Sequence, residues 1–557
     1  MIADRGGVRW RPFLLALAVL VLWFGFLEIR GLYFPDEGRY AEIPREMLAT
    51  GDWVTPRLNG IPYFEKPPLQ YWATAAIFAV AGQDEWTTRL WPAFGGLAAV
   101  IAVLVTVRRL FSKRAGWMAA AVMGSCWGYF IATQFVTLDM TLSAFMTGAL
   151  CAFLIAQDAR QSATEQRDYM LAAWALCALA VLTKGVIGAV LPILAIGVYL
   201  AVSRDVSLLR RLHVRSGALL FALIVAPWFV MAELRNPGFA DFFFIHEHVL
   251  RYLRPEHHRP GPWFYFIPIA LVFLMPWLPA MIAALVHRAR LPRLRPSVGV
   301  DPRVFAWCSA IAIFVFFSLS SSKLPAYIMP AIGAVAIAVA APLARRFDAT
   351  LRMTAWTLGI AGIVGSALAI PAMTFVKVPM VREALAGSIG WVFAGSFMFV
   401  VAALIANALR KRRKPLRALA ILAVASMIGC QMACLLLSRV DAYFSAELLI
   451  ERVLVSEARR PAVAEVPFYS VDMFDQTVPF YLGRTMTLVR EQSELAWGIA
   501  NAPANFLPTL DDFERKWRAD DTAYAIMRRE TYDKFAADGL PMRLVDTDGR
   551  RVVVSRR

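Results

Sequence analysis

Residues 34–72 read FPDEGRYAEIPREMLATGDWVTPRLNGIPYFEKPPLQYW, and they directly follow an apolar run long enough to cross a membrane. The stretch is dense in acidic, basic and aromatic side chains. One interpretation is an ordinary juxtamembrane cap, whose charges are solvated and whose aromatic side chains belong to the interface belt. The density of Asp, Glu, Arg, Lys and Tyr together instead favours a binding or catalytic site at the membrane surface.

The composition of the whole chain indicates the class of protein. Of 557 residues, 59% are hydrophobic and 18% are charged, and the mean hydropathy is +0.55. A soluble protein of this size has too little interior to bury so much apolar surface, which predicts a polytopic α-helical membrane protein surrounded by membrane lipids. The net charge of +17 is explained by basic loops on one side of the membrane, and we expect no nucleic-acid partner.

Thirteen apolar segments are long enough to be interpreted as transmembrane helices. The segment at 169–183 is short against the ~20 residues that a span normally needs. The segment at 264–287 contains three prolines, which predict a kinked or broken helix. The segments lie at about 12–32, 89–107, 115–135, 139–157, 169–183, 185–203, 214–232, 263–287, 304–320, 324–344, 353–375, 390–409 and 416–438.

The charges of the connecting loops predict the orientation. With the N-terminus in the cytoplasm, the six loops on that side are short and basic, whereas the short loops on the other side carry few charges. An odd number of spans then places the C-terminus outside, which in a bacterium is the periplasm. We therefore expect a multi-pass protein of the bacterial inner membrane, whose outer loops at about 33–88 and 233–262 face the periplasm.

The chain divides into two predicted domains. Residues 1–439 form the transmembrane domain, and residues 440–557 are less apolar and are typical of a small periplasmic α/β domain. In the second domain, PFYSV and TMTLV indicate strands, TLDDFERKW indicates a helix, and MRLVDTDGRRVVVSR indicates a hairpin on an Asp-Gly turn.

The first outer loop begins with a predicted helix that gathers polar side chains. Asp36, Arg39 and Tyr40 have the spacing i, i+3 and i+4, so they share one face of a helix. Pro44 is expected to end or kink that helix or to begin the next one. The apolar stretch 69–82 is short for a span, which favours an interfacial helix.

Three further polar residues of this loop lie in a stretch that is expected to be extended. Tyr63, Glu65 and Lys66 come just before Pro67 and Pro68, and a proline disfavours helical backbone in the residue before it. The extended backbone would present these side chains at the membrane surface, beside the first helix.

Asp139 stands at the outer edge of two apolar runs, with no basic neighbour in sequence. An ionisable group in such a place is costly unless it is paired, which makes it a functional candidate. The alternative is a solvated turn residue or a helix N-cap, a position that Thr137 could fill equally well.

The second outer loop holds four of the six histidines of the chain, in FFFIHEHVLRYLRPEHHRPGPWFYF. A divalent metal such as zinc could be bound by His246 together with Glu65 of the first loop. No closed set of four ligands is visible, and we expect no cofactor to be required for the chemistry. Lys323 and Tyr327 lie in SSSKLPAYIMP, a short outer loop at the membrane surface.

These motifs together resemble the GT-C lipid-linked glycosyltransferases. The resemblance is carried by DEGRYAE, GDWVTPRLNGIPYFEKPPLQYW, Asp139, HEHVLRYL with the following PWFYF, and SKLPAYIMP. Within this superfamily the sequence is most similar to the bacterial lipid A 4-amino-4-deoxy-L-arabinose transferases. The resemblance implies a GT-C fold of about thirteen transmembrane helices, with interfacial helices and a periplasmic α/β domain.

The resemblance also implies an activity. Such an enzyme moves 4-amino-4-deoxy-L-arabinose from undecaprenyl phosphate to a phosphate of lipid A, which makes lipopolysaccharide less anionic and favours resistance to polymyxin. Related transferases that act on a protein or glycan hydroxyl, including protein O-mannosyltransferases, share an acidic first-loop motif and remain an alternative. A flippase for the lipid-linked sugar is a second alternative, but it is disfavoured because no internal repeat is evident and the charged residues cluster at one face.

The charged and hydrogen-bonding residues of the outer loops suit this transfer. The leaving group is a lipid phosphate, whose developing charge needs cations and hydrogen-bond donors. The catalytic candidates are Asp36 and Asp139. An acceptor phosphate is already ionised, so Asp36 would orient it or stabilise positive charge on the sugar, whereas a hydroxyl acceptor would need Asp36 as general base. The candidate substrate-binding residues are Arg39, Tyr40, Tyr63, Lys66, Arg251, Lys323 and Tyr327.

Overall fold

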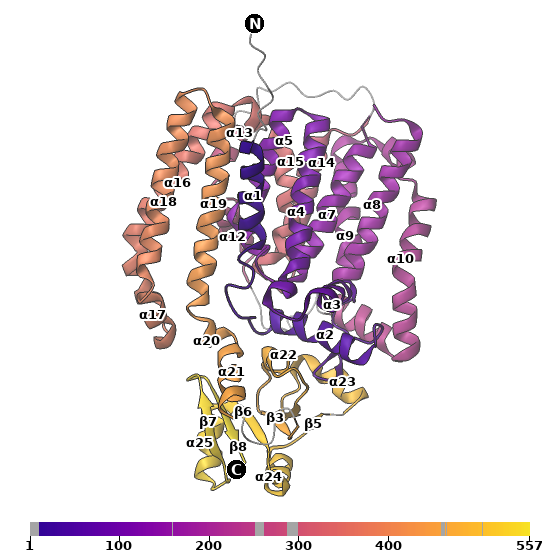
Figure 1. The fold of residues 1–557 in the computed structure, drawn as a ribbon. Helices are drawn as coiled ribbons and strands as arrows, with labels where there is room; N and C mark the ends of the chain where they lie inside the picture. The colour runs from indigo at the N-terminus through magenta and orange to yellow at the C-terminus, as the bar shows by residue number, and fades with distance from the viewer. Residues whose placement is uncertain are drawn as a thin grey trace.

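The computed structural model describes residues 10–158, 160–250, 261–286, 299–457, 463, 465–503 and 505–556. Long helices stand side by side in a bundle, and a smaller region of strands and short helices lies at one end of that bundle (Figure 1).

Apolar sequence forms the helices of the bundle, as predicted. Each of the thirteen predicted segments overlaps one helix or a broken pair of helices, but the segment predicted at 12–32 is helical only as far as Phe24. The helices are α1 (Trp10–Phe24), α4 (Glu85–Leu110), α5 (Lys113–Ser125), α6 (Trp127–Ala132), α7 (Leu138–Ala156), α8 (Ala163–Lys184), α9 (Ile187–Ser203), α10 (Val214–Arg235), α12 (Phe266–Phe273), α13 (Leu278–Val286), α14 (Pro302–Leu319), α15 (Met329–Arg345), α16 (Phe347–Ala372), α18 (Ile389–Lys411) and α19 (Pro415–Ser438). Short helices η1 (Val206–Arg211), η5 (Met373–Phe375) and α17 (Pro379–Ala386) connect some of them.

Several of these helices are suited to cross a membrane. Among the described residues, eight helices are long and apolar enough, and the bent pair α12–α13 would make a ninth span. The protein is therefore a multi-pass membrane protein, while the number of thirteen spans stays a prediction. Helices α16 and α18 lie at the edge of the bundle, farthest from α10 (Figure 1).

Two spans are broken where the sequence disfavours a continuous helix. The axes of α12 and α13 differ by 105°, which confirms the break predicted from the prolines. The segment 115–135 is also divided, into α5 and α6. The two breaks meet, because the N–H of Trp127 donates to the carbonyl of Met275 at 2.9 Å. One backbone group freed at each break is thus satisfied inside the protein, as a membrane requires.

Helix α8 is longer than its apolar segment. It begins at Ala163, after a capping box in which Ser162 and Glu165 bind each other's backbone N–H groups. Its first turns are polar, so apolarity alone detected only residues 169–183 of the 22-residue helix.

A group of shorter elements covers the end of the bundle that faces the α/β region (Figure 1). These are α2 (Asp36–Thr50), β1 (Arg57–Leu58), β2 (Ile61–Pro62), α3 (Leu69–Ala81), the π-helix η2 (Asp241–Leu250) and η4 (Pro325–Ile328). Of the alternatives expected at Pro44, an end or a new start of the helix is wrong, because α2 continues through Pro44 to Thr50. Its C-cap, Gly51, lies in the left-handed region with φ of 70°. Burial of residues 37–47 offsets the hydrogen bond that Pro44 cannot make.

The C-terminal region is an α/β domain around one mixed sheet. Its strand order is β5-β4-β3-β6-β8-β7, with β5, β4, β3 and β6 parallel and the last two pairs antiparallel. The predicted strands, helix and terminal hairpin are all confirmed. The elements are α20 (Asp441–Phe444), α21 (Glu447–Ser456), β3 (Phe468–Val471), α22 (Thr477–Leu482), β4 (Thr487–Val489), η6 (Ser493–Leu495), α23 (Ala496–Asn501), β5 (Phe506–Leu507), α24 (Leu510–Ala519), β6 (Tyr524–Arg528), α25 (Arg529–Ala537), β7 (Arg543–Thr547) and β8 (Arg551–Ser555).

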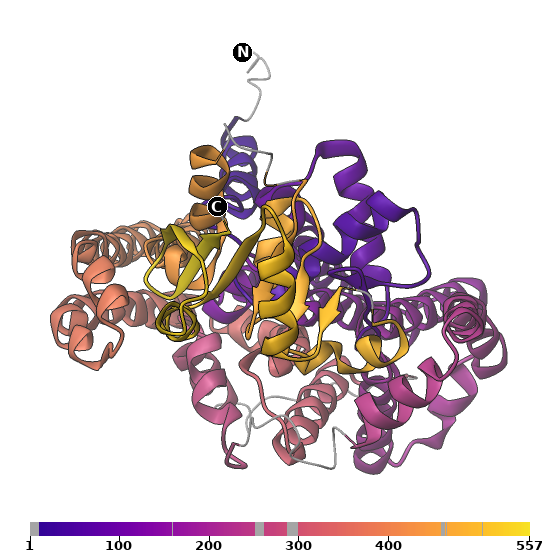
Figure 2. The same ribbon diagram turned by 90° about the horizontal axis from the view of Figure 1, so that it is seen from below.

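The α/β domain packs tightly on α2 and on the β1–β2 hairpin. A Cβ atom at Gly38 would lie 2.6 Å from backbone atoms of Gln476 and Thr477, so only glycine allows this approach. The side chain of Asn59 exchanges two hydrogen bonds with the backbone of Met486, at 2.8 and 2.7 Å. Viewed from its own side, the domain lies over the centre of the bundle end (Figure 2).

The segment that links bundle and domain carries a pH-sensitive carboxyl group. Burial, reinforced by the carboxylates of Glu85 and Asp441, raises the pKa of Glu447 from 4.5 to about 7. The folded protein therefore holds this proton more tightly than the unfolded chain does, and stability is lost as the pH rises through the interval between these two pKa values. We expect the melting temperature to be lower at pH 8 than at pH 6.

Glu447→Gln should remove much of this pH dependence, and thermal unfolding of the purified protein followed by tryptophan fluorescence measures it. Glu451→Gln is the matched control, because Glu451 is one turn further along α21 and is exposed. An unchanged difference between pH 6 and pH 8 in the Glu447→Gln protein would contradict the prediction.

Candidate active site at the outer end of the bundle

A cavity of about 620 Å³ lies between the end of the bundle and the α/β domain. Its walls come from α2, the chain before α3, the first turn of α7, the last residue of α8, η2, η4, η6 and α23. The described residues that line it are Asp36, Arg39, Tyr40, Glu65, Lys66, Thr137, Leu138, Asp139, Lys184, Phe242, His246, Glu247, Leu324, Tyr327, Ser493, Glu494, Ala496 and Trp497.

Helix α2 contributes Asp36, Arg39 and Tyr40, the face that the spacing predicted. The guanidinium of Arg39 lies 2.5 Å from a carboxylate oxygen of Glu494 in the α/β domain and 3.5 Å from Asp36. Burial alone would lower the pKa of Arg39, but Glu494 raises that pKa above its usual value, so Arg39 stays charged. Asp36 has 51% of its side chain exposed, so it remains accessible to a ligand in the cavity.

Three tyrosines surround Arg39. Its guanidinium carbon lies 5.7 Å from the ring centre of Tyr40 and 5.6 Å from that of Tyr63, and the rings of Tyr40 and Tyr71 are 6.1 Å apart. Burial raises the pKa of Tyr40 and Tyr63 well above 10, so both hydroxyls stay protonated. Among the described residues, the buried hydroxyls of Tyr63 and Tyr71 have no hydrogen-bond partner. Neither residue lines the cavity, so these two hydroxyls lie buried behind its wall.

Lys66 lies between carboxylates from two outer loops. Its ammonium donates to the carbonyl of Glu65 at 2.7 Å, and it lies 3.7 Å from the Glu65 carboxylate and 3.8 Å from that of Glu247. Glu65 precedes Lys66 in the chain, whereas Glu247 comes from η2. The first and second outer loops thus meet at Lys66, as a shared site requires.

Asp139 has a charged partner that its sequence neighbourhood does not reveal. The ammonium of Lys184, at the end of α8, lies 2.5 Å from the Asp139 carboxylate and 4.7 Å from the ring centre of Tyr327. The alternative role of Asp139 as a helix cap is not observed, because Thr137 caps α7 and Asp139 lies within the first turn.

Glu65 and His246, the predicted metal ligands, both line the cavity. His246 lies 3.5 Å from Glu247 and stacks on the ring of Phe242. In the described parts of the chain, no group of three or more His, Cys, Asp or Glu side chains is placed to hold a metal ion. The described ligand set is therefore incomplete for zinc.

Three predicted binding residues are not among the described residues that line the cavity. Tyr63 is buried beside Arg39, with 1% of its surface exposed. Arg251 lies outside the described residues. The ammonium of Lys323 donates to the carbonyl of Ser320, in the loop before η4, and the side chain is buried there. Lys323 is thus held by its own loop.

Several lining residues were not singled out from the sequence, among them Glu494, Trp497, Glu247 and Lys184. Glu494 and Trp497 come from the C-terminal domain, more than 400 residues after α2 in the chain, and no local sequence pattern marks them. Glu247 was visible between two histidines. Lys184 was visible as the lone basic residue at the outer end of two apolar segments, which is a usable signal.

The cavity contains both acidic and basic side chains, and the acidic ones are more numerous among the described residues. Five of its described lining residues are carboxylic acids and three are Lys or Arg. Each of these cations lies within 4 Å of at least one of the carboxylates. Such a site suits a ligand that carries both a phosphate and a cationic group, since each ligand charge can replace one of the existing partners.

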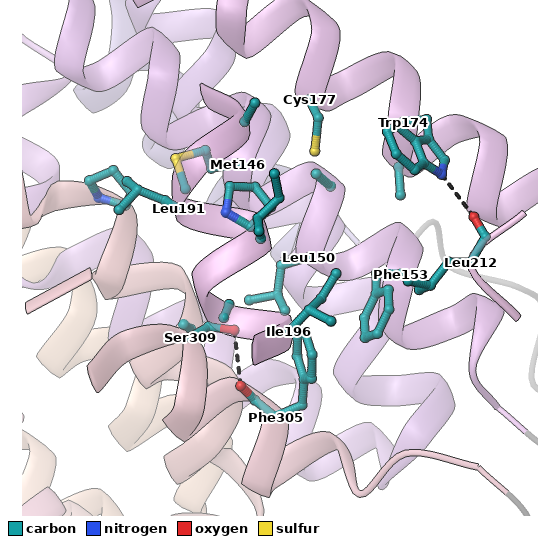
Figure 3. A pocket seen from close by; sticks show the side chains of 18 of the residues that line it. Met146, Leu150, Phe153, Trp174, Cys177, Leu191, Ile196, Leu212, Phe305 and Ser309 are labelled. Atoms are coloured by element: carbon teal, nitrogen blue, oxygen red, sulfur yellow. Dashed lines mark hydrogen bonds between the residues drawn. The ribbon is translucent and has the colours of Figure 1, made fainter. Parts of the chain in front are cut away.

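A second cavity, of about 140 Å³, lies inside the bundle between α7, α8, α9 and α14 (Figure 3). Side chains such as Leu150, Phe153 and Ile196 point into it, and no described residue that lines it carries a charge. Trp174 directs its N–H away, to the carbonyl of Leu212 at 2.9 Å. The candidate site is therefore the charged cavity and not this apolar one.

Comparison with known proteins gives two matching family descriptions. Residues 454–556 match the aminoarabinose transferase C-terminal domain, and residues 10–243 match the dolichyl-phosphate-mannose-protein mannosyltransferases. A relative from Shewanella sediminis, named undecaprenyl phosphate-alpha-4-amino-4-deoxy-L-arabinose arabinosyl transferase, is 31% identical over 60% of this chain and 59% of its own length. A relative of the same name from Pseudomonas aeruginosa is 30% identical over 66% of this chain and 67% of its own. The chain thus spans less than two thirds of the Shewanella sediminis relative.

Solved structures cover the chain more completely. ArnT from Cupriavidus metallidurans, bound to undecaprenyl phosphate, has a TM-score of 0.92 and 35% identity, over 99% of both chains. The oligosaccharyltransferase of Archaeoglobus fulgidus has a TM-score of 0.50 and 14% identity, over 95% of this chain and 71% of that one, which is a likeness of fold alone.

Proposed function

We propose that this protein, which belongs to the aminoarabinose transferase family, transfers 4-amino-4-deoxy-L-arabinose from undecaprenyl phosphate to a phosphate of lipid A. Its fold is the GT-C fold that the sequence predicted. The observation that carries the proposal is the charged cavity at the end of the bundle, where cations and carboxylates from two outer loops and the α/β domain meet.

The position of the cavity suits a donor that is anchored in lipid. The sugar of such a donor lies at the membrane surface while its chain stays in the bilayer, and the cavity opens where the spans α7, α8 and α15 end. The related ArnT was crystallised bound to undecaprenyl phosphate, which supports a donor of this class. We further propose that the cavity and the C-terminus face the periplasm of a bacterial inner membrane.

The proposed reaction is a displacement at the anomeric carbon of the sugar. An oxygen of the acceptor phosphate forms the new bond, and the bond from the anomeric carbon to the undecaprenyl phosphate oxygen breaks. The electron pair of that bond leaves with the carrier as undecaprenyl phosphate. No proton has to be removed from an ionised acceptor phosphate, so no strong general base is needed.

The residues of the cavity take their roles from the charges in this step. Lys66 and Lys184 would bind the phosphate oxygens of the donor. They would also stabilise the negative charge that develops on this phosphate as it leaves. Asp36 would face the positive charge of the sugar, carried by its ammonium group and by the anomeric carbon in the transition state. Asp139 would share this task and hold Lys184 in place. Tyr40 and Tyr327 would supply hydroxyl donors, since both line the cavity, whereas Tyr63 is buried beside Arg39 and does not line it.

Glu65 and His246 would hold a zinc ion if one is bound, but the mechanism assigns it no step. The described residues alone do not complete its ligand set. Elemental analysis of the purified protein, with His246→Ala as the control, measures whether metal is present.

Lys66→Ala should weaken the use of the donor. A lost charge-assisted contact of this kind costs about 1.5–3 kcal/mol, so kcat/KM should fall roughly 10- to 100-fold. Transfer kinetics with the purified protein measure this fall. Arg57→Ala is the matched control, because Arg57 lies in the same loop, binds Asp52 and does not line the cavity. Equal kinetics in the two variants would contradict a phosphate-binding role for Lys66.

The orientation is tested by a reporter fused after Arg557 that is active only in the periplasm. We expect activity. A reporter active only in the cytoplasm would place the cavity on the opposite side of the membrane from its proposed substrates.

The activity in cells is tested by mass spectrometry of lipid A from strains with and without this protein. We expect lipid A that carries aminoarabinose only when the protein is present. The match to mannosyltransferases over residues 10–243 supports an alternative acceptor, a hydroxyl of a protein or glycan. Unmodified lipid A, together with a newly glycosylated protein, would favour that alternative.

A further inference from the structure

Glu37, next to Asp36, is fully enclosed by protein, with 2% of its surface exposed. It does not line the cavity, and the proposed mechanism gives it no task. We propose that Glu37 is a positioning residue, whose carboxylate fixes the distance between the two segments that carry Asp36 and Asp139. This inference rests on the proposed function of those two aspartates.

The first link of Glu37 is to the chain just before Asp36. One of its carboxylate oxygens accepts the backbone N–H of Tyr33 at 3.1 Å, and its own N–H donates to the carbonyl of Tyr33 at 3.0 Å. These two bonds close the turn that begins α2. Asp36 lies inside that turn, so its place relative to the cavity is fixed by them.

The second link is to the chain just before Asp139. The other carboxylate oxygen of Glu37 accepts the backbone N–H of Val136 at 2.9 Å. The next residue, Thr137, caps α7, and Asp139 lies in the first turn of that helix. A single carboxylate thus joins the start of α2 to the start of α7, across 99 residues of sequence.

Two arginines hold this carboxylate ionised and in place. Arg89 donates to both of its oxygens at 3.0 Å, and Arg30 makes a second two-pronged contact. Burial alone would raise the pKa of Glu37, but Arg30 and Arg89 lower it well below its usual value. Arg30 also donates to the carbonyl of Gln134 at 2.8 Å, on the same segment as Val136.

The arrangement predicts a kinetic effect as well as a loss of stability. A misplacement of ~1 Å between reacting groups costs up to about 100-fold in rate. Glu37→Gln keeps the shape of the side chain but weakens its hydrogen bonds to both arginines and to the backbone of both segments. We expect kcat of the folded protein to fall about 10- to 100-fold, with little change in the KM for the donor.

The test compares Glu37→Gln with Glu42→Gln at equal amounts of folded protein. Glu42 is a matched control, because it lies on the same helix, is fully buried and is paired with Arg45 at 2.6 Å, yet it does not touch the Asp139 segment. Both variants should lose stability, but only Glu37→Gln should lose kcat. Equal kcat values in the two folded variants would overturn the proposal.

A double-mutant cycle with Asp139→Asn adds a readout that a purely structural role would not change. If Glu37 acts by placing Asp139, then Glu37→Gln should cost much less in the Asp139→Asn background than in the wild type. If the fold loss of kcat in the double variant equals the product of the losses in the two single variants, the proposal is overturned. Should Glu37→Gln fail to fold, Glu37→Asp replaces it, with an ionised carboxylate that is one methylene too short to reach both segments. A wild-type kcat in Glu37→Asp would then overturn the proposal.

The outcomes separate this inference from the proposed function. An inactive wild type would contradict the proposed function itself, whereas an active wild type with unchanged kcat in the folded Glu37 variants contradicts only the positioning role.

Discussion

Asp36→Asn is expected to abolish measurable transfer of aminoarabinose to lipid A. Asparagine keeps the size of the side chain and much of its hydrogen bonding, but it removes the negative charge that we propose faces the sugar. The site lies between the membrane and a packed domain, where the effective dielectric is low and a fixed charge is worth far more than in water. Losses of roughly 10²–10⁴-fold are typical when such a group is removed.

The measurement is the rate of lipid A modification at matched protein levels, with binding of the carrier measured separately. Carrier binding should survive in Asp36→Asn, since the phosphate-binding cations remain. Asp52→Asn is the control, because Asp52 belongs to the same outer loop, caps a turn through Val54 and Thr55, and does not line the cavity. Near-normal lipid A modification in the Asp36→Asn strain would return the first outer loop to a structural role.

Asp139→Asn is expected to lower kcat/KM by about 100-fold, a severe but incomplete loss. The substitution removes one anion from the cavity and leaves the ammonium of Lys184 without the partner that lies 2.5 Å away. The effect should therefore depend on Lys184. In Lys184→Gln, the further cost of Asp139→Asn should be smaller than in the wild type, by about 0.5–3 kcal/mol of coupling.

Steady-state kinetics of the two single variants and the double variant measure this coupling. Independent effects of Asp139 and Lys184 would contradict their action as a pair, and wild-type kinetics in Asp139→Asn would remove Asp139 from the catalytic set.

Sequence alone located the apolar helices of the bundle, because the physics that specifies them is local, while the number of thirteen spans stays a prediction. A membrane helix needs an apolar run, and each of the thirteen runs overlaps helical structure, although α1 ends at Phe24, eight residues before the end predicted for the first run. The errors arose where local rules compete with packing. Polar first turns hid the start of α8, and burial of α2 carried the helix through Pro44.

The site was predictable where charge density was itself the signal. Asp36, Arg39, Lys66 and Asp139 stood out because ionisable groups at a membrane edge are costly without a function. Their partners were not predictable, because each partner comes from a distant part of the chain. The Asp139–Lys184 contact spans 45 residues, and Arg39 meets Glu494 only after the C-terminal domain has docked.

Lys323 was a candidate for the same reason. From sequence it is a cation at the membrane surface, like Lys66. In the fold its ammonium binds the carbonyl of Ser320, and only the folded structure distinguishes a cation that faces the cavity from one that binds its own loop.

If this protein itself moves aminoarabinose between two lipid phosphates, the purified protein should do so without any other enzyme. The most direct measurement reconstitutes the purified protein in vesicles with undecaprenyl phosphate-aminoarabinose and lipid A, and follows the mass of the lipid A by mass spectrometry. We predict a mass increase of one aminoarabinose unit with the wild type and none with Asp36→Asn. Lipid A that keeps its original mass in the presence of folded wild-type protein and intact donor would contradict the account.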